Sequence, residues 1–189
     1  VRGYSVRPVQ RRGVDLVVCL DTSRSMFVRD VRPDRLTRAK REISDLFERM
    51  RGDRAALIAF SGEPRQVAPL THDVVTLQKL LAATNPEENT LGGTDIGTAL
   101  KRSLDVFDGA TGAHEAIVLV TDGEDLEGKG LEVAKKAAER GIRIFVLGMG
   151  TEQGGKIPIA IDGGGEVLLR DNLGKEVVST MDSASLIKI

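Results

Sequence analysis

Residues 14–25, which read VDLVVCLDTSRS, decide the fold. The first seven residues form a run rich in β-branched side chains with a single polar interruption, a pattern typical of a strand that is covered on both faces. Such strands occur in sheets that carry helices on both sides, so this stretch predicts an α/β protein. The polar residues from Asp21 onward then follow the carboxyl end of that strand.

The rest of the chain alternates between two periodicities. Short apolar runs predict further buried strands over 55–60, 116–120 and 142–147. Apolar residues at steps of three and four predict helices over 32–50, 74–81, 95–107 and 131–140. This alternation predicts a doubly wound, mostly parallel sheet with helices on both faces.

Two segments depart from that alternation. Residues 66–70 are β-like and follow the strand at 55–60 after only about five residues, which predicts an antiparallel edge strand. Residues 157–161, 166–170 and 176–179 are short β-like pieces separated by turns, which predict a C-terminal β-hairpin appendage. We therefore expect a basic arm over 1–13 and one domain over 14–189, truncated in a final helix that begins near Asp182.

Composition excludes several classes of protein. The 189 residues include 27 basic and 28 acidic side chains, and the net charge of -1 argues against a dedicated nucleic-acid binder. The longest apolar run has six residues, so this fragment is expected to be soluble. Cys19 is the only cysteine, which argues against disulfides and thiolate zinc sites and fits a small buried side chain. His72 and His114 lack metal-ligand spacing and are interpreted as loop or surface residues.

Five oxygen-bearing side chains follow the ends of predicted strands or precede a predicted helix. They are Asp21, Ser23, Ser25, Thr94 and Asp122. Ligands of an open α/β sheet bind at the carboxyl ends of its strands, where these residues are expected to meet. Two carboxylates and three hydroxyls suit Mg²⁺, with Mn²⁺ or Ca²⁺ as substitutes, and do not suit zinc or copper. A cation held in this way would attract a further carboxylate.

This constellation resembles the metal-ion-dependent adhesion site (MIDAS) of von Willebrand factor A (VWA) domains, over roughly residues 14–150. Within that family, the segments at 13–21, 33–40, 52–54 and 121–125 are similar to bacterial Bat (aerotolerance-type) membrane proteins. The resemblance implies Mg²⁺ bound directly by Asp21, Ser23 and Ser25, with Thr94 and Asp122 direct or through water. It also implies a non-enzymatic module whose protein partner supplies Asp or Glu to the metal.

The resemblance extends to the parent protein. Bat-like parents are flanked by transmembrane helices and are often encoded near MoxR-type AAA+ ATPases. This implies a parent anchored in the bacterial inner membrane, with the domain in the periplasm and a role in complex assembly or stress tolerance. Other Bat-like proteins or a MoxR-type system are the implied partners.

Residues beside the motif are candidates for contact with the partner. Arg24 stands where many relatives have Gly, and it either contacts the incoming carboxylate or points to solvent, which we favour. Glu124, Asp125 and Glu127 form an acidic cluster that either tunes the local field or lies in a solvated loop, which we also favour. Arg24, Glu124 and Asp125 are the partner-binding candidates.

Alternative functions are weighed against the same residues. A Mg²⁺-dependent phosphoaspartyl phosphatase would need a second carboxylate two residues after Asp21, where this chain has Ser23. Subtilisin-like hydrolases lack support because neither histidine begins a Gly-rich helix. No GxxxxGK[ST] motif is present for a P-loop. A purely structural domain with a vestigial metal site stays open.

Overall fold

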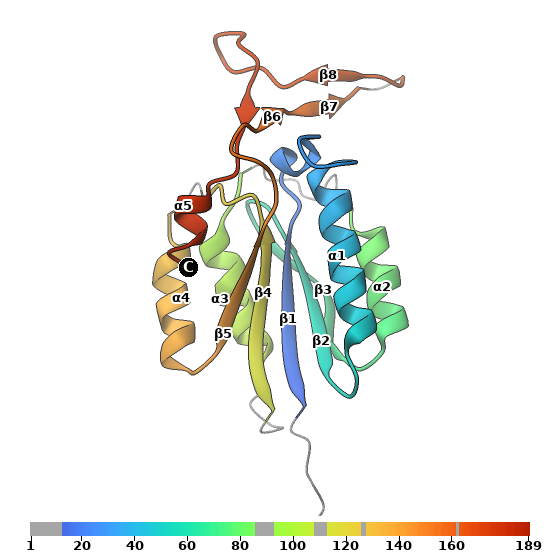
Figure 1. Ribbon diagram of the computed structural model, residues 1–189, viewed down its shortest axis with the longest axis vertical. Helices are drawn as coiled ribbons and strands as arrows, with labels where there is room; N and C mark the ends of the chain where they lie inside the picture. The colour runs from blue at the N-terminus through green and yellow to red at the C-terminus, as the bar shows by residue number, and fades with distance from the viewer. Residues whose placement is uncertain (1–12, 86–92, 108–112, 126–127, 162) are drawn as a thin grey trace, which may run out of the picture.

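A five-stranded sheet with the order β3-β2-β1-β4-β5 forms the centre of the computed structural model (Figure 1). The structure describes residues 13–85, 93–107, 113–125, 128–161 and 163–189. The strands are β1 (Val14–Asp21), β2 (Arg54–Phe60), β3 (Pro64–Thr71), β4 (His114–Thr121) and β5 (Arg143–Gly148). All neighbouring pairs are parallel except β2 with β3. The predicted doubly wound sheet and its antiparallel edge strand are confirmed.

Helices cover both faces of this sheet. They are the short 3-10 helix η1 (Arg24–Phe27) and the α-helices α1 (Arg35–Arg49), α2 (Val74–Ala83), α3 (Ile96–Val106), α4 (Gly130–Glu139) and α5 (Ser183–Leu186). α1 and α2 pack with Leu16, Val18 and Leu20 of β1, and α3 and α4 pack with Val17 and Cys19. Because successive side chains of a strand point to opposite faces, β1 serves two separate cores.

Aspartates define where several helices begin. Asp34 accepts a hydrogen bond from the backbone N–H of Thr37 at 2.7 Å, so α1 begins at Arg35. The periodicity predicts a start at residue 32, which is three residues too early. Asp95 caps α3 in the same way through Thr98. These caps satisfy N–H groups that have no partner inside the helix.

The central strand β1 is deeply buried. Val17, Val18, Cys19 and Leu20 have no exposed surface. Burial raises the pKa of Cys19 to about 12, which confirms a buried, unreactive thiol. His72 and His114 lie on the surface, as expected.

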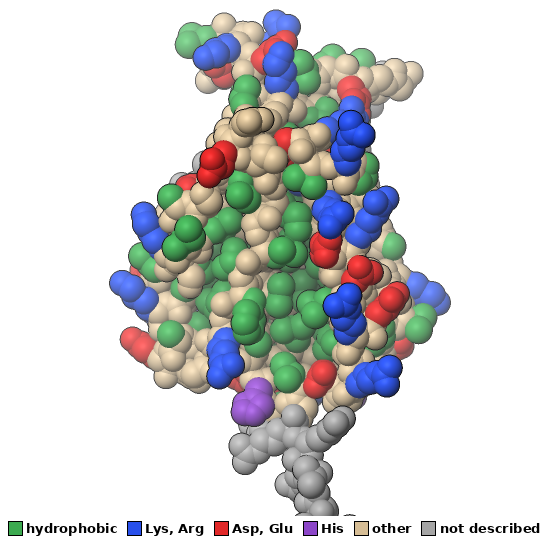
Figure 2. All heavy atoms as spheres, in the orientation of Figure 1, with side chains coloured by type: hydrophobic (Ala, Val, Ile, Leu, Met, Phe, Trp, Pro, Cys, Tyr) green, Lys and Arg blue, Asp and Glu red, His purple; other side chains and the backbone are tan. Residues whose placement is uncertain are grey.

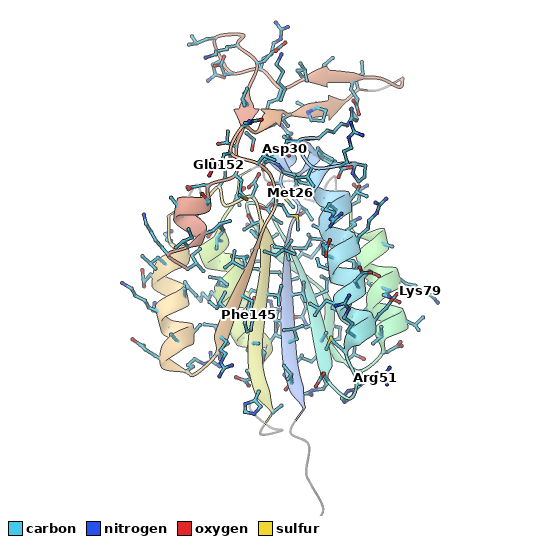
Figure 3. The ribbon with its side chains drawn as sticks, in the orientation of Figure 1. Met26, Asp30, Arg51, Lys79, Phe145 and Glu152 are labelled. Atoms are coloured by element: carbon cyan, nitrogen blue, oxygen red, sulfur yellow. The ribbon has the colours of Figure 1, made fainter. Side chains whose placement is uncertain are left out.

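The edge strand β5 differs from the prediction of a buried strand. Phe145 is 55% exposed and Leu147 is 38% exposed, whereas Ile144 and Val146, on the other face of β5, pack against the core with α3 and α4. Figure 2 shows hydrophobic side chains over this part of the sheet, and Figure 3 labels Phe145 there. A local pattern predicts a strand at 142–147, but it does not reveal that the strand lies at the edge of the sheet or which of its faces is covered.

Residues after β5 form an appendage at the carboxyl edge of the sheet (Figure 1). β6 (Gly155–Lys156) pairs with β9 (Val178–Ser179), and β7 (Pro158–Ala160) pairs with β8 (Glu166–Leu168), both antiparallel. The predicted strands at 157–161 and 166–170 correspond to β7 and β8, and β6 is a short strand that the sequence pattern did not predict. We define residues 151–181 as the appendage. The predicted final helix begins at Ser183, with Asp182 as its N-cap. Residues 1–12 of the predicted basic arm (1–13) and Glu127 lie outside the described residues.

None of the helices in the described part of the chain is long and apolar enough to cross a membrane.

Replacement of Leu57 by Ala tests the core around β1. Leu57 is fully buried in the cluster formed with α1 and α2, so we expect Leu57→Ala to lower the free energy of unfolding by about 2–5 kcal/mol. Val75→Ala, at a side chain that is 60% exposed, should change it by about 0.5 kcal/mol or less. Urea unfolding followed by circular dichroism measures both. Equal effects of the two substitutions would contradict the assigned core.

Candidate metal centre

Two buried carboxylates meet at the carboxyl edge of the sheet. Asp21 ends β1 and Asp122 directly follows β4, and these strands are parallel neighbours in which Leu20 pairs with Val120. Neither aspartate has exposed surface. The hydroxyl of Thr121 donates to Oδ2 of Asp21 at 2.6 Å, which holds that carboxylate across the two strands. The register of the sheet therefore brings the two aspartates together from 101 positions apart in the sequence.

The loop after β1 adds two hydroxyls to this edge. The backbone N–H of Ser23 donates to Oδ1 of Asp21 at 2.8 Å, which turns the chain back over the carboxylate. The hydroxyl oxygens of Ser23 and Ser25 lie 2.9 Å apart, and both residues are buried. The alternate spacing of these three residues thus brings their side chains together, as expected from the sequence.

Thr94 reaches the same edge from a third direction. It lies buried immediately before α3, and the N–H of the next residue, Asp95, donates to the carbonyl of Ser61 at 2.9 Å. Ser61 follows Phe60, which pairs with Asp21 across β1 and β2. Thr94 is therefore anchored beside the Asp21 loop.

The electrostatics of the site favour a bound cation. Burial and the nearby charge of Asp122 raise the pKa of Asp21 to about 7, against the hydrogen bonds from Thr121 and Ser23 that lower it. A divalent cation between the two buried carboxylates would offset their electrostatic repulsion. No three His, Cys, Asp or Glu side chains gather as a metal cluster in the described part of the chain, and the buried hydroxyls of Ser23, Ser25 and Thr94 are the other side-chain oxygens at this edge. The donor set fits a hard, oxygen-preferring ion.

A buried arginine that the sequence analysis missed holds Asp122. Arg35, at the start of α1, has no exposed surface and donates from Nη1 to Oδ2 of Asp122 at 2.9 Å. Its Nε and Nη2 donate to both carboxylate oxygens of Asp30, at 2.9 and 2.7 Å. The one signal in the sequence is that Arg35 directly precedes Leu36, the first residue of the apolar stripe of the helix. Because arginines are rarely buried without a partner, a buried Arg35 would also have required an acidic partner.

The partner-binding candidates fall into three different environments. Arg24 is exposed to solvent at the rim of the site. Glu124 is partly buried, and burial together with the charge of Asp122 raises its pKa, so it does not belong to a fully solvated loop. Asp125 accepts the N–H of Gly130 at 2.9 Å and that of Ile96 at 3.4 Å. The Asp125 carboxylate therefore joins the starts of α3 and α4 and does not lie in a fully solvated loop, while its contact with a partner stays a prediction.

The raised pKa of Asp21 predicts a pH dependence of the metal-free chain. Between 3.8, the ordinary value, and about 7, the folded state binds more protons at Asp21 than the unfolded state does. The contribution of Asp21 to the free energy of unfolding therefore falls as pH rises through this range, by at most about 1.4 kcal/mol per pH unit. Urea unfolding in EDTA should show wild type losing stability relative to Asp21→Asn from pH 5 to pH 7. Parallel pH profiles would contradict the assigned environment.

Comparisons with known proteins identify the fold and the family of the chain. The family model described as von Willebrand factor type A domain matches residues 16–124. The crystal structure of an aerotolerance-related membrane protein from Bacteroides fragilis is 35% identical, with a TM-score of 0.88 over 93% of this chain and 86% of that chain. The conserved hypothetical protein BatB from Bacteroides thetaiotaomicron has the same identity and TM-score, over 93% of this chain and 84% of that chain.

A more distant structure shares the fold alone. Proximal thread matrix protein 1 from the mussel byssus, solved with a zinc-occupied MIDAS motif, is 23% identical, with a TM-score of 0.61 over 72% of this chain and 38% of that chain. No curated protein matches the chain. The family model covers more than half of the sequence, and the two Bacteroides structures match nearly all of it. The chain belongs to the family of von Willebrand factor type A domains.

Proposed function

We propose that this chain is a metal-dependent protein-interaction module that binds a carboxylate of its partner through a divalent cation, Mg²⁺ first and Mn²⁺ or Ca²⁺ as substitutes. The observation that carries the proposal is the buried, mutually repelling pair Asp21 and Asp122 with the hydroxyls of Ser23 and Ser25 beside it. Thr94 completes the proposed ligand set. The family membership and the zinc-occupied MIDAS motif of the mussel protein support a divalent metal at this site.

Different residues of the site would compensate the charge of the cation, provide its neutral oxygen ligands and orient those ligands. When bound, the cation supplies a positive centre that accepts an Asp or Glu oxygen from the partner. Asp21 and Asp122 offset its charge, and the hydroxyls of Ser23, Ser25 and Thr94 add oxygen ligands without further charge. Thr121 keeps Asp21 turned toward the site through its 2.6 Å hydrogen bond. Because the hydroxyls add no negative charge, the bound cation would still attract an anionic ligand.

Contacts around the cation would set the choice of partner. Arg24 is exposed at the rim, and Glu124 lies partly buried beside Asp122, so both are placed to contact a docked protein. A charge at the rim changes mainly the rate of association and the selection among partners.

The module is proposed to be non-catalytic. The phosphoaspartyl alternative needs an acid-base carboxylate at position 23, and the Ser23 hydroxyl there is instead hydrogen-bonded to Ser25. Of the nearby carboxylates, Asp30 is held by Arg35. Turnover of a phosphate ester by the purified domain with Mg²⁺ would overturn this assignment.

The parent protein is proposed to be a Bat-like membrane protein of a bacterium. Two solved relatives, one named BatB and the other an aerotolerance-related membrane protein, match 93% of the chain at 35% identity. We place the domain in the periplasm, on an inner-membrane anchor, with other Bat-like proteins or a MoxR-type AAA+ ATPase system as partners. Complex assembly or stress tolerance is the corresponding role.

Binding of Mg²⁺ should raise the melting temperature of the purified chain. At a free concentration ten times the dissociation constant, the gain is about 1.4 kcal/mol, or about 3–6 °C for a domain of this size. Asp21→Ala should remove the shift, whereas Asp105→Asn, at an exposed position on α3, should keep it. Differential scanning calorimetry with and without EDTA measures both. A wild-type shift that survives Asp21→Ala would refute the assigned ligand set.

Capture of the partner should require the same residues. We expect the tagged chain to retain a protein from an extract of its native organism with Mg²⁺, to lose it in EDTA, and to lose it with Asp21→Ala or Asp122→Ala. Asp105→Asn is the matched control, because it also removes one carboxylate. Mass spectrometry of the eluted material identifies the partner. Equal retention by the Asp21 variant and wild type would contradict carboxylate capture by the metal.

A further inference from the structure

The Arg35 guanidinium joins the metal centre to parts of the chain that are distant in sequence. Besides Asp122, its Nη1 donates to the hydroxyl of Ser179 at 3.0 Å, and its Nη2 donates to the carbonyl of Ser179 at 3.1 Å. Nη1 also lies 3.4 Å from the carbonyl of Ser25, a proposed metal ligand. One buried side chain therefore contacts two ligand residues of the metal centre and the strand β9 that ends the appendage.

Both ends of the appendage are tied to this guanidinium. Asp30, which accepts two hydrogen bonds from Arg35, also accepts the N–H and the hydroxyl of Thr151 through Oδ2, at 2.8 and 3.1 Å. Thr151 begins the appendage and Ser179 lies near its end. Figure 3 labels Asp30 where the appendage meets the main sheet. The Asp30–Arg35 pair is thus the common anchor of the two ends.

The backbone packs closely around the anchor. Gly150 has a φ of 128°, and a Cβ there would lie 2.8 Å from Cζ of Arg35. Gly154 has a φ of 65°, and a Cβ there would collide with the carbonyl oxygen of Ser179. Any side chain at either position would displace the guanidinium or β9. This close fit leaves little freedom for Arg35 to move by itself.

The hydrogen bonds of Asp122 show what Arg35 does for the metal centre. Its Oδ2 accepts from Arg35 at 2.9 Å and from the Ser179 hydroxyl at 3.4 Å. Its Oδ1 accepts a long hydrogen bond of 3.4 Å from the N–H of Glu124, and in the described part of the chain no stronger bond to this oxygen is found. The guanidinium therefore orients the carboxylate so that Oδ1 is the oxygen left for a cation. Residues behind metal ligands commonly control affinity in this way.

The backbone of Asp122 adds a direct connection to the appendage. Its carbonyl accepts the N–H of Asp182 at 2.9 Å, and the N–H of Met181 donates to the carbonyl of Thr151 at 3.1 Å. These two amides report whether the end of the appendage stays in place. Immobilising Asp122 should make both hydrogen bonds open less often.

We infer that Arg35 is a positioning residue that orients Asp122 for the divalent cation and, through Ser179 and Asp30, makes the anchorage of the appendage depend on occupancy of the metal centre. This inference rests on the proposed metal-binding function. Arginine is required because its planar fork serves Asp30, Asp122 and Ser179 at once, which the single ammonium of lysine cannot do.

Arg35→Lys tests the inference with Mg²⁺ as the only ligand. In wild type, we expect saturating Mg²⁺ to slow hydrogen exchange at the amides of Met181 and Asp182. In Arg35→Lys, we expect the dissociation constant for Mg²⁺ to rise about tenfold and the slowing to disappear, although the positive charge is kept. Isothermal titration calorimetry and hydrogen-exchange mass spectrometry of the whole chain give the two readouts.

Two further variants keep the test decisive. Glu176→Gln breaks the ion pair with Lys156 inside the appendage, away from the anchor, and should leave both readouts at wild-type values. Ser179→Ala removes only a hydroxyl from the anchor, and should at least halve the Mg²⁺-induced slowing even if Arg35→Lys does not fold. If Arg35→Lys does fold, the Mg²⁺-induced slowing of exchange must disappear in Arg35→Lys and be at least halved in Ser179→Ala.

The outcomes separate this inference from the function on which it rests. Wild-type chain that does not bind Mg²⁺ would overturn the metal centre, and this inference with it. Mg²⁺ binding without slower exchange at Met181 and Asp182 would overturn the inference and leave the metal centre intact. So would an Arg35→Lys variant that binds Mg²⁺ as tightly as wild type, or more tightly.

Discussion

The repulsion between two carboxylates that have lost their water is the constraint on which this domain is organised. Asp21 and Asp122 meet because β1 and β4 are parallel neighbours, and both are fully buried. Burial of unpaired charge is costly, so the surrounding residues must compensate. Thr121 and the N–H of Ser23 donate to one carboxylate, and Arg35 donates to the other. A divalent cation would supply the remaining compensation, which links the stability of the fold to its binding function.

The same constraint explains the architecture near the site. The loops that carry Ser23 and Thr94 are held by hydrogen bonds at the carboxyl end of β2, since Thr22 donates to the carbonyl of Phe60 and Asp95 donates to that of Ser61, the next residue. The sheet thus positions the side chains of Ser23 and Thr94, which lie in loops. Binding sites that are positioned in advance lose less entropy when a ligand arrives. The two ends of the appendage are also held by hydrogen bonds, in their case to the Asp30–Arg35 pair.

Family membership and local chemistry carry different parts of the conclusion. The family model and the Bacteroides structures establish a von Willebrand factor type A domain. Functions within one fold vary with the site, so the proposal of carboxylate capture depends on the donor set at the sheet edge. The proposed donor set contains only carboxylates and hydroxyls, which are ligands that hard divalent cations prefer.

Local sequence determined the order of strands and helices, the antiparallel edge strand at β3, and the candidate ligands at the ends of β1 and β4, because periodicity and turn composition act over a few residues. Only the tertiary structure decided that β5 is partly exposed, that Asp125 joins two helix starts, and that Arg35 is buried against Asp122. Arg35 and Ser179 are 144 positions apart, and no local pattern encodes a contact at that separation. Their meeting depends on the order of strands in the sheet and on the path of the chain after β5.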